Sequence, residues 1–169
     1  SLASTDKAVA VSCGNYYTVV LLDTGEVRAC GSNNYGQLGR GTLTFKNSDG
    51  GGGENEFVSM NASSTYNQTN AFAISGGGDK TVVLLDTGEV IACGSNEHGQ
   101  LGRGYAPSSN WITVVAKNTL SSMNVGPYYD KNAVAISCGN LHTVILLNTG
   151  EVMALSLIHI SEPTRRTII

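Results

Sequence analysis

The sequence predicts an all-β fold, a partial β-propeller, on three observations. The chain repeats itself at intervals of 62 to 63 residues, which indicates one structural unit per repeat, each stacked on its neighbours. Every unit holds short apolar runs separated by turn residues, a pattern typical of antiparallel strands. Gly is abundant, with 21 of 169 residues, and Pro is scarce, with 3, so tight turns are expected rather than long helices.

The repeats differ in completeness. Residues Ala8–Gly41 and Ala71–Gly104 are identical at 25 of 34 positions, and Ala133–Ala154 is a third copy that stops partway. We therefore expect two complete repeats and a truncated third, within a repeat domain that spans residues 1–154.

The sequence pattern of the first repeat predicts three successive strands. Ala8–Cys13 alternates small and larger apolar residues, the period of two that a pleated strand requires. Thr18–Leu22 is a β-branched and apolar run, typical of a strand buried on both faces. Asp23–Gly25 supplies turn residues, and Glu26–Gly31 is the returning strand.

A fourth strand is expected in the polar segment that follows each complete unit. The first segment contains the apolar stretch Phe57–Met60, and the second contains Trp111–Val115. Four antiparallel strands per repeat describe one blade of a β-propeller.

The ordered motifs CGxxxT, LLxTGEV, ACGxN and GQLGxG resemble the regulator of chromosome condensation repeat. The resemblance implies a seven-bladed propeller. This chain departs from the family at Gly76, which stands where the other copies have cysteine, and at Tyr17 and Lys80, which stand where the family usually has His. Only His142 keeps that residue.

Two motifs resemble catalytic loops. Leu21–Gly25 and Leu84–Gly88 each read Leu-Leu-Asp-Thr-Gly, like the paired loops of aspartic proteases, in which two carboxylates share one proton. The third copy has Asn148 in place of the Asp without other change, which favours a hairpin turn. Gly76–Thr81 is similar to the end of a phosphate-binding loop, but Asp79 precedes the lysine and would repel an anion, so a turn is again expected.

The remaining chemistry-bearing residues predict no metal or cofactor site. The cysteines Cys13, Cys30, Cys93 and Cys138 form no C-x-x-C pair, and we interpret them as small buried strand residues. The three histidines fall at unrelated places in the repeats. Asn61 and Asn67 begin Asn-x-Ser/Thr triplets, a glycosylation pattern that matches often by chance.

Net charge and hydropathy argue against two classes of partner, nucleic acid and the membrane. Ten Lys and Arg against 13 Asp and Glu give a net charge of −3, so no basic surface for a nucleic-acid backbone is expected. No run of 18 apolar residues is present, so we expect no membrane-spanning helix.

We therefore expect protein partners and no catalytic activity. The leading hypothesis is a protein-interaction scaffold, and the alternative is guanine-nucleotide exchange on a small GTPase, the activity of the founding member of the family that the chain resembles. Candidate partner-binding residues lie at a turn where the repeats differ. They are Tyr16, Tyr17, Asp79, Lys80, Leu141 and His142, which we expect to form one arc on one propeller face.

Residues 155–169 depart from the repeat. The other copies continue with Cys-Gly-Ser-Asn, whereas Leu155–Arg165 reads LSLIHISEPTR. That string resembles the translation of a transposase adapter used in sequencing-library preparation, so we expect the native sequence to end at Ala154. Because Leu155–Ile160 is apolar and β-prone, we also expect local propensity to extend the preceding strand into it.

Overall fold

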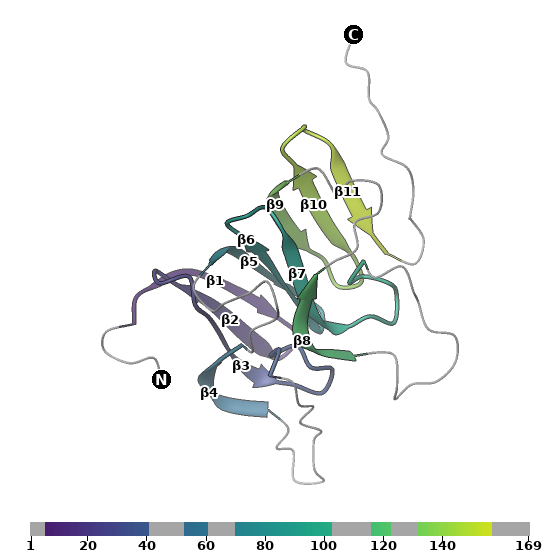
Figure 1. Ribbon diagram of the computed structural model, residues 1–169. Helices are drawn as coiled ribbons and strands as arrows, with labels where there is room; N and C mark the ends of the chain where they lie inside the picture. Colours follow the sequence, from purple (N-terminus) through teal and green to yellow (C-terminus); the bar gives the residue numbers. More distant parts are fainter. Residues whose placement is uncertain (1–5, 41–52, 61–69, 103–115, 123–131, 157–169) are drawn as a thin grey trace.

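The computed structural model describes residues 6–40, 53–60, 70–102, 116–122 and 132–156. Within these residues the regular structure is entirely β-strand, in three antiparallel sheets that follow one another along the chain (Figure 1). Blade 1 comprises β1 (Ala8–Gly14), β2 (Tyr17–Leu22), β3 (Val27–Ser32) and β4 (Gly53–Ser59). Blade 2 comprises β5 (Ala71–Gly77), β6 (Lys80–Leu85), β7 (Val90–Ser95) and β8 (Ala116–Ser122). Blade 3 comprises β9 (Ala133–Cys138), β10 (Thr143–Leu147) and β11 (Val152–Leu155).

The expected strands are confirmed for the first three positions of each repeat. The fourth strand of blade 1, β4, overlaps the expected stretch Phe57–Met60. In blade 2 the fourth strand is β8, which begins at Ala116, directly after the expected stretch Trp111–Val115. That stretch and the triplets at Asn61 and Asn67 lie outside the described residues.

The third blade follows the template to its last described strand. β11 ends at Leu155, which pairs with Thr143. Leu155 takes the place that Cys30 and Cys93 hold in the other blades, and it is buried at 8% exposure. Residues 157–169 lie outside the described residues.

A repeated loop places one leucine of each complete blade in the core. Asn33 Oδ1 accepts a hydrogen bond from the Leu38 backbone N–H at 3.0 Å, and Gln37 Oε1 accepts one from the Tyr35 N–H at 2.9 Å. Blade 2 repeats the loop, and Asn96 Oδ1 accepts from the Leu101 N–H at 2.9 Å. These side chains satisfy backbone donors that burial would otherwise leave unpaired. The Asn, Gln and Leu of the motif are therefore residues of one loop structure.

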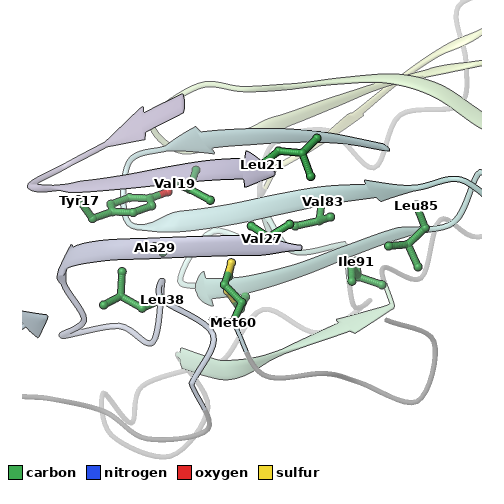
Figure 2. Packing of buried hydrophobic residues seen from close by; sticks show 11 residues of the cluster. Tyr17, Val19, Leu21, Val27, Ala29, Leu38, Met60, Val83, Leu85 and Ile91 are labelled. Atoms are coloured by element: carbon green, nitrogen blue, oxygen red, sulfur yellow. The ribbon is translucent and has the colours of Figure 1, made fainter. Parts of the chain in front are cut away.

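Two hydrophobic cores hold the blades together, one on each side of blade 2. Val83, Leu85 and Ile91 pack toward blade 1 (Figure 2). Their neighbours Val82, Leu84 and Val90 pack toward blade 3. Alternate side chains of a strand point to opposite faces, so β6 and β7 are buried on both faces and read as continuous apolar runs. Each buried side chain of this size contributes about 1.5–3 kcal/mol.

Hydroxyl groups connect neighbouring blades by a repeated set of hydrogen bonds. Ser12 Oγ accepts from the Gly76 N–H at 2.9 Å, and Ser75 Oγ accepts from the Cys138 N–H at 3.0 Å. On the second strand of blades 2 and 3, a buried threonine hydroxyl donates to a backbone carbonyl of the preceding blade. These pairs are Thr81 with Gln37 at 2.7 Å and Thr143 with Gln100 at 2.8 Å. The edge strands β1, β5 and β9 contact one another in succession, and we call them the inner strands.

We expect Asn96→Ala to lower the free energy of unfolding by about 1–3 kcal/mol, because it leaves the buried Leu101 N–H without its acceptor. Thr87→Ala is the control, since Thr87 is exposed and its hydroxyl only accepts a long 3.4 Å bond from the Glu89 N–H. Urea unfolding followed by circular dichroism measures both. Equal midpoints for the two variants would contradict the loop's role.

Candidate protein-binding surface

The three variable turns lie together at one end of the inner strands, as expected. They connect β1 to β2, β5 to β6 and β9 to β10. The Asn15 N–H donates to the Gly78 carbonyl at 2.7 Å, which joins the first turn to the second. Lys80 Nζ donates to the Asn140 carbonyl at 3.2 Å, which joins the second to the third. We call residues 15–17, 78–80 and 140–142 the turn arc.

Two of the six candidate residues are buried between blades, which corrects the expectation that all six face a partner. Tyr17 is 4% exposed, and its hydroxyl donates to the Lys80 carbonyl. Lys80 is 0% exposed, and its ammonium donates to the carbonyls of Gly139 at 2.6 Å and Gly77 at 3.2 Å as well as to Asn140. Both side chains cross to the next blade, so they stabilise the packing of blades rather than contact solvent.

Burial shifts the pKa of both residues. Desolvation raises the pKa of the Tyr17 hydroxyl well above its ordinary value, so the group stays a neutral donor. Desolvation lowers the pKa of Lys80, while its three carbonyl partners satisfy all three ammonium protons. The sequence held a signal for this role, because both residues replace the His that the resembled family usually has at a fixed place beside the repeated Thr.

The other four candidates differ in exposure. Tyr16 is 91% exposed and Leu141 45%, His142 is also exposed, and Asp79 is half-buried. Tyr16 has a φ of 59°, the sole positive φ at a non-glycine residue in the described part of the chain. A bulky residue in this region is strained by about 1–2 kcal/mol. An exposed aromatic ring held at such a cost is a feature found at functional sites.

Asp79 lies where the turn arc meets the loop of blade 1. Its Oδ1 accepts from Gln37 Nε2 at 3.4 Å. Desolvation raises the pKa of the Asp79 carboxyl above its ordinary value, and the nearby Glu97 carboxylate raises it further. The turn arc therefore carries a carboxylate beside exposed aromatic and aliphatic side chains.

The motifs that resemble catalytic loops are hairpin turns in the structure. Asp23 and Asp86 are exposed in the turns of separate blades, where Gly25 and Gly88 have φ of 80° and 82°. The N–H of each of these glycines donates a hydrogen bond to the backbone carbonyl of the leucine three residues earlier, at 3.0 Å. Gly76–Thr81 forms the end of β5, its turn and the start of β6. The conformation that glycine allows at positive φ explains these motifs.

The four cysteines, all among the described residues, form no disulfide. Only Cys93 is fully buried and Cys13 is exposed, which corrects the expectation that all four are buried. Among the described residues no group of three or more His, Cys, Asp or Glu is arranged to hold a metal ion. That part of the chain also has no helix long and apolar enough to cross a membrane.

Antiparallel four-stranded sheets, stacked face to face and bonded along their inner strands, define part of a β-propeller. The pattern described as regulator of chromosome condensation (RCC1) repeat matches residues 8–37 and 73–100. A second pattern of the same description matches residues 87–146. Together the matches cover more than half of the chain, which belongs to the RCC1 repeat family.

Similarities to known proteins are consistent with membership of this family. The probable E3 ubiquitin-protein ligase HERC6 of Homo sapiens is 30% identical over 149 residues, 86% of this chain and 13% of the ligase. The crystal structure of human WBSCR16 superposes with a TM-score of 0.71 at 19% identity, covering 91% of this chain and 34% of that one. Prp20p of Saccharomyces cerevisiae, in a structure titled with its binding to Gsp1p and histones, gives 0.67 at 16% identity over 88% and 33%. The chain spans 3% to 13% of the length of the curated relatives it matches.

We expect Tyr16→Gly to raise the free energy of unfolding by about 0.5–1 kcal/mol, because glycine adopts the positive φ without strain. Leu141→Gly is the matched control. Leu141 holds the equivalent position without a positive φ, so glycine there only adds freedom to the unfolded chain and destabilises the fold. Urea unfolding compares the two, and a loss of stability in Tyr16→Gly would contradict the strain at this turn.

We expect Asp79→Asn to stabilise the chain at neutral pH by less than about 1 kcal/mol, since the half-buried site is partly screened by solvent. The folded state raises the pKa of this carboxyl, so the folded state binds the proton more tightly than the unfolded chain. Wild-type stability therefore falls as pH rises from about 4 through the folded-state pKa. The gain in Asp79→Asn should vanish in acid, where both states are protonated.

Urea unfolding across this pH range measures the difference. Thr87→Ala, in the exposed turn of blade 2, is the control, because it changes no ionisable group. A gain in Asp79→Asn that persists unchanged at acidic pH would contradict the assignment to the carboxyl.

Proposed function

We propose that these repeats act as a protein-interaction scaffold that binds partners through the turn arc and performs no chemistry of its own. The observation that carries the proposal is Tyr16, an exposed aromatic side chain kept at a strained backbone position. Aromatic side chains bring a large contact area at a low cost in conformational entropy. Leu141 extends the same arc with an exposed side chain.

The two buried residues of the turn arc, Tyr17 and Lys80, support this proposal because they hold the turns in place. Tyr17 and Lys80 bond each turn to the backbone of the next blade. A turn fixed in this way loses little further freedom when a partner binds, which favours affinity. The two motifs that resemble catalytic loops are ordinary hairpin turns, so they give no support to a hydrolytic or phosphate-transfer activity.

Guanine-nucleotide exchange on a small GTPase is the alternative. It is favoured by the family membership and by the similarity to Prp20p, whose structure title names Gsp1p binding. Exchange factors and scaffolds both use loops of a rigid fold, so the two functions differ in what the bound partner does.

A nucleotide-release assay separates the two functions. Small GTPases of several classes are loaded with fluorescent GDP and mixed with the chain. We expect no acceleration above spontaneous release, because the proposal gives the chain only a binding role. Robust acceleration that Tyr16→Ser abolishes would overturn the scaffold proposal in favour of exchange.

The binding role has its own test. A photo-crosslinking amino acid replaces Tyr16 or, as control, Glu56, an exposed residue of the outer strand β4. We expect specific crosslinked adducts at position 16 and none at position 56. Equal labelling at both positions would contradict a role for the turn arc.

A further inference from the structure

The inner strands carry a second repeated feature at the end opposite the turn arc. Each begins with a β-bulge: Ala8 pairs with Leu22 and Ala10 with Leu21, so Val9 has no partner of its own. The register skips Phe72 in β5 and Val134 in β9 in the same way. Bulges turn a side chain out of the regular alternation and occur near binding sites.

All three bulge residues are apolar, and all three are exposed. The exposed fractions are 56% for Val9, 66% for Phe72 and 47% for Val134. Phe72 belongs to the middle blade, which packs against a blade on each side. Its exposure is therefore not due to a missing neighbour. We call Val9, Phe72 and Val134 the bulge arc.

Hairpin turns with carboxylates flank the central member of the bulge arc. The Ala71 N–H donates to the Gly25 carbonyl at 3.2 Å, which holds the Asp23–Gly25 turn of blade 1 beside Phe72. The Asp86 N–H donates to the Asn70 carbonyl at 3.0 Å, which holds the turn of blade 2 on the other side. Both aspartates are exposed, and within the described residues neither forms a salt bridge.

The same arrangement continues to the third blade with one difference. The Ala133 N–H donates to the Gly88 carbonyl at 3.0 Å, so Val134 also lies next to the turn of blade 2. Its other flank is the turn that begins at Asn148, an uncharged residue. Apolar side chains thus alternate with polar turns along the arc, and the carboxylates are concentrated around Phe72. Lys7, two residues before Val9, is exposed and places a positive charge at one end of the bulge arc.

We infer that the bulge arc docks a segment of another protein in which apolar side chains alternate with lysine or arginine. The inference rests on the proposed function, that these repeats bind protein, and it adds a second surface and the chemistry of its partner. Apolar side chains would cover Val9, Phe72 and Val134, and cations would meet Asp23 and Asp86. A cation placed over the ring of Phe72 gains further.

Charge argues against a second copy of this chain as the occupant. The chain carries a net charge of −3, and two bulge arcs facing each other would bring like carboxylates together. Like charges opposed across an interface are unfavourable. A basic, apolar segment has the complementary charge.

The test is fluorescence polarisation with a labelled peptide in which leucine and lysine alternate. We expect saturable binding to the chain that weakens as salt rises, because exposed charges are screened. Phe72→Ser should weaken binding about tenfold, as expected for a central aromatic contact, and Val134→Ser should weaken it less. Val152→Ser, at an exposed apolar residue of β11 that belongs to neither arc, is the matched control and should bind like the wild type.

Two further peptides test the chemistry of the partner. A leucine–glutamate peptide should not bind, and a serine–lysine peptide should bind more weakly than the leucine–lysine peptide. Asp86→Asn should weaken leucine–lysine binding and reduce its salt dependence, with Glu56→Gln in the outer strand β4 as control. Each variant is first shown to be folded by its urea transition.

Several results would overturn the inference. They are unchanged binding in Phe72→Ser, equal binding of the glutamate peptide, and loss of a dimer in Phe72→Ser by light scattering, which would make a second copy the occupant. These results leave crosslinking at position 16 untouched, so the proposed function would survive them. Accelerated nucleotide release would overturn the proposed function without changing the peptide result.

Discussion

Hydrogen bonds between neighbouring blades are the constraint on which the rest of the structure depends. A serine hydroxyl of one blade accepts a hydrogen bond from a backbone N–H of the next blade. A threonine hydroxyl of the next blade donates to the glutamine carbonyl in the repeated loop of the preceding blade. These groups lie at the same blade interfaces as the two apolar cores, where an unpaired polar atom is costly. Because the same bonds occur at both interfaces, each blade is placed on its neighbour in the same way.

This regular stacking creates the two ends of the molecule at which the proposed binding surfaces lie. At one end the turns between the first and second strands of each blade are joined to one another, and the buried Tyr17 and Lys80 anchor them. Tyr16 is left exposed above this anchor. At the other end, bulges turn Val9, Phe72 and Val134 outward beside acidic turns. A single repeated strand thus presents two surfaces of different chemistry.

Motifs in a repeat protein have to be judged by the position they occupy in the unit. The Asp-Thr-Gly triplet and the Gly-rich stretch before Lys80 resemble catalytic sequences, but each is the turn that its place between two strands requires. Glycine at positive φ is needed there for the backbone alone. The same triplet nevertheless supplies the carboxylates of Asp23 and Asp86 to the surface around Phe72.

The sequence by itself determined the strands, their order and the family, because the repeats preserve the residues that local structure and the cores require. The period of two predicted β1, and the continuous apolar runs predicted β2 and β6, which are buried on both faces. It also predicted that the variable turns share one end, since equivalent loops of stacked units align. Only the tertiary structure decided that Tyr17 and Lys80 point into the next blade while Tyr16 points to solvent, because that depends on how one blade packs on another. The exposure of Phe72 was likewise hidden from the sequence, since a bulge shifts the alternation of side chains by one residue and a sequence pattern carries no record of that shift.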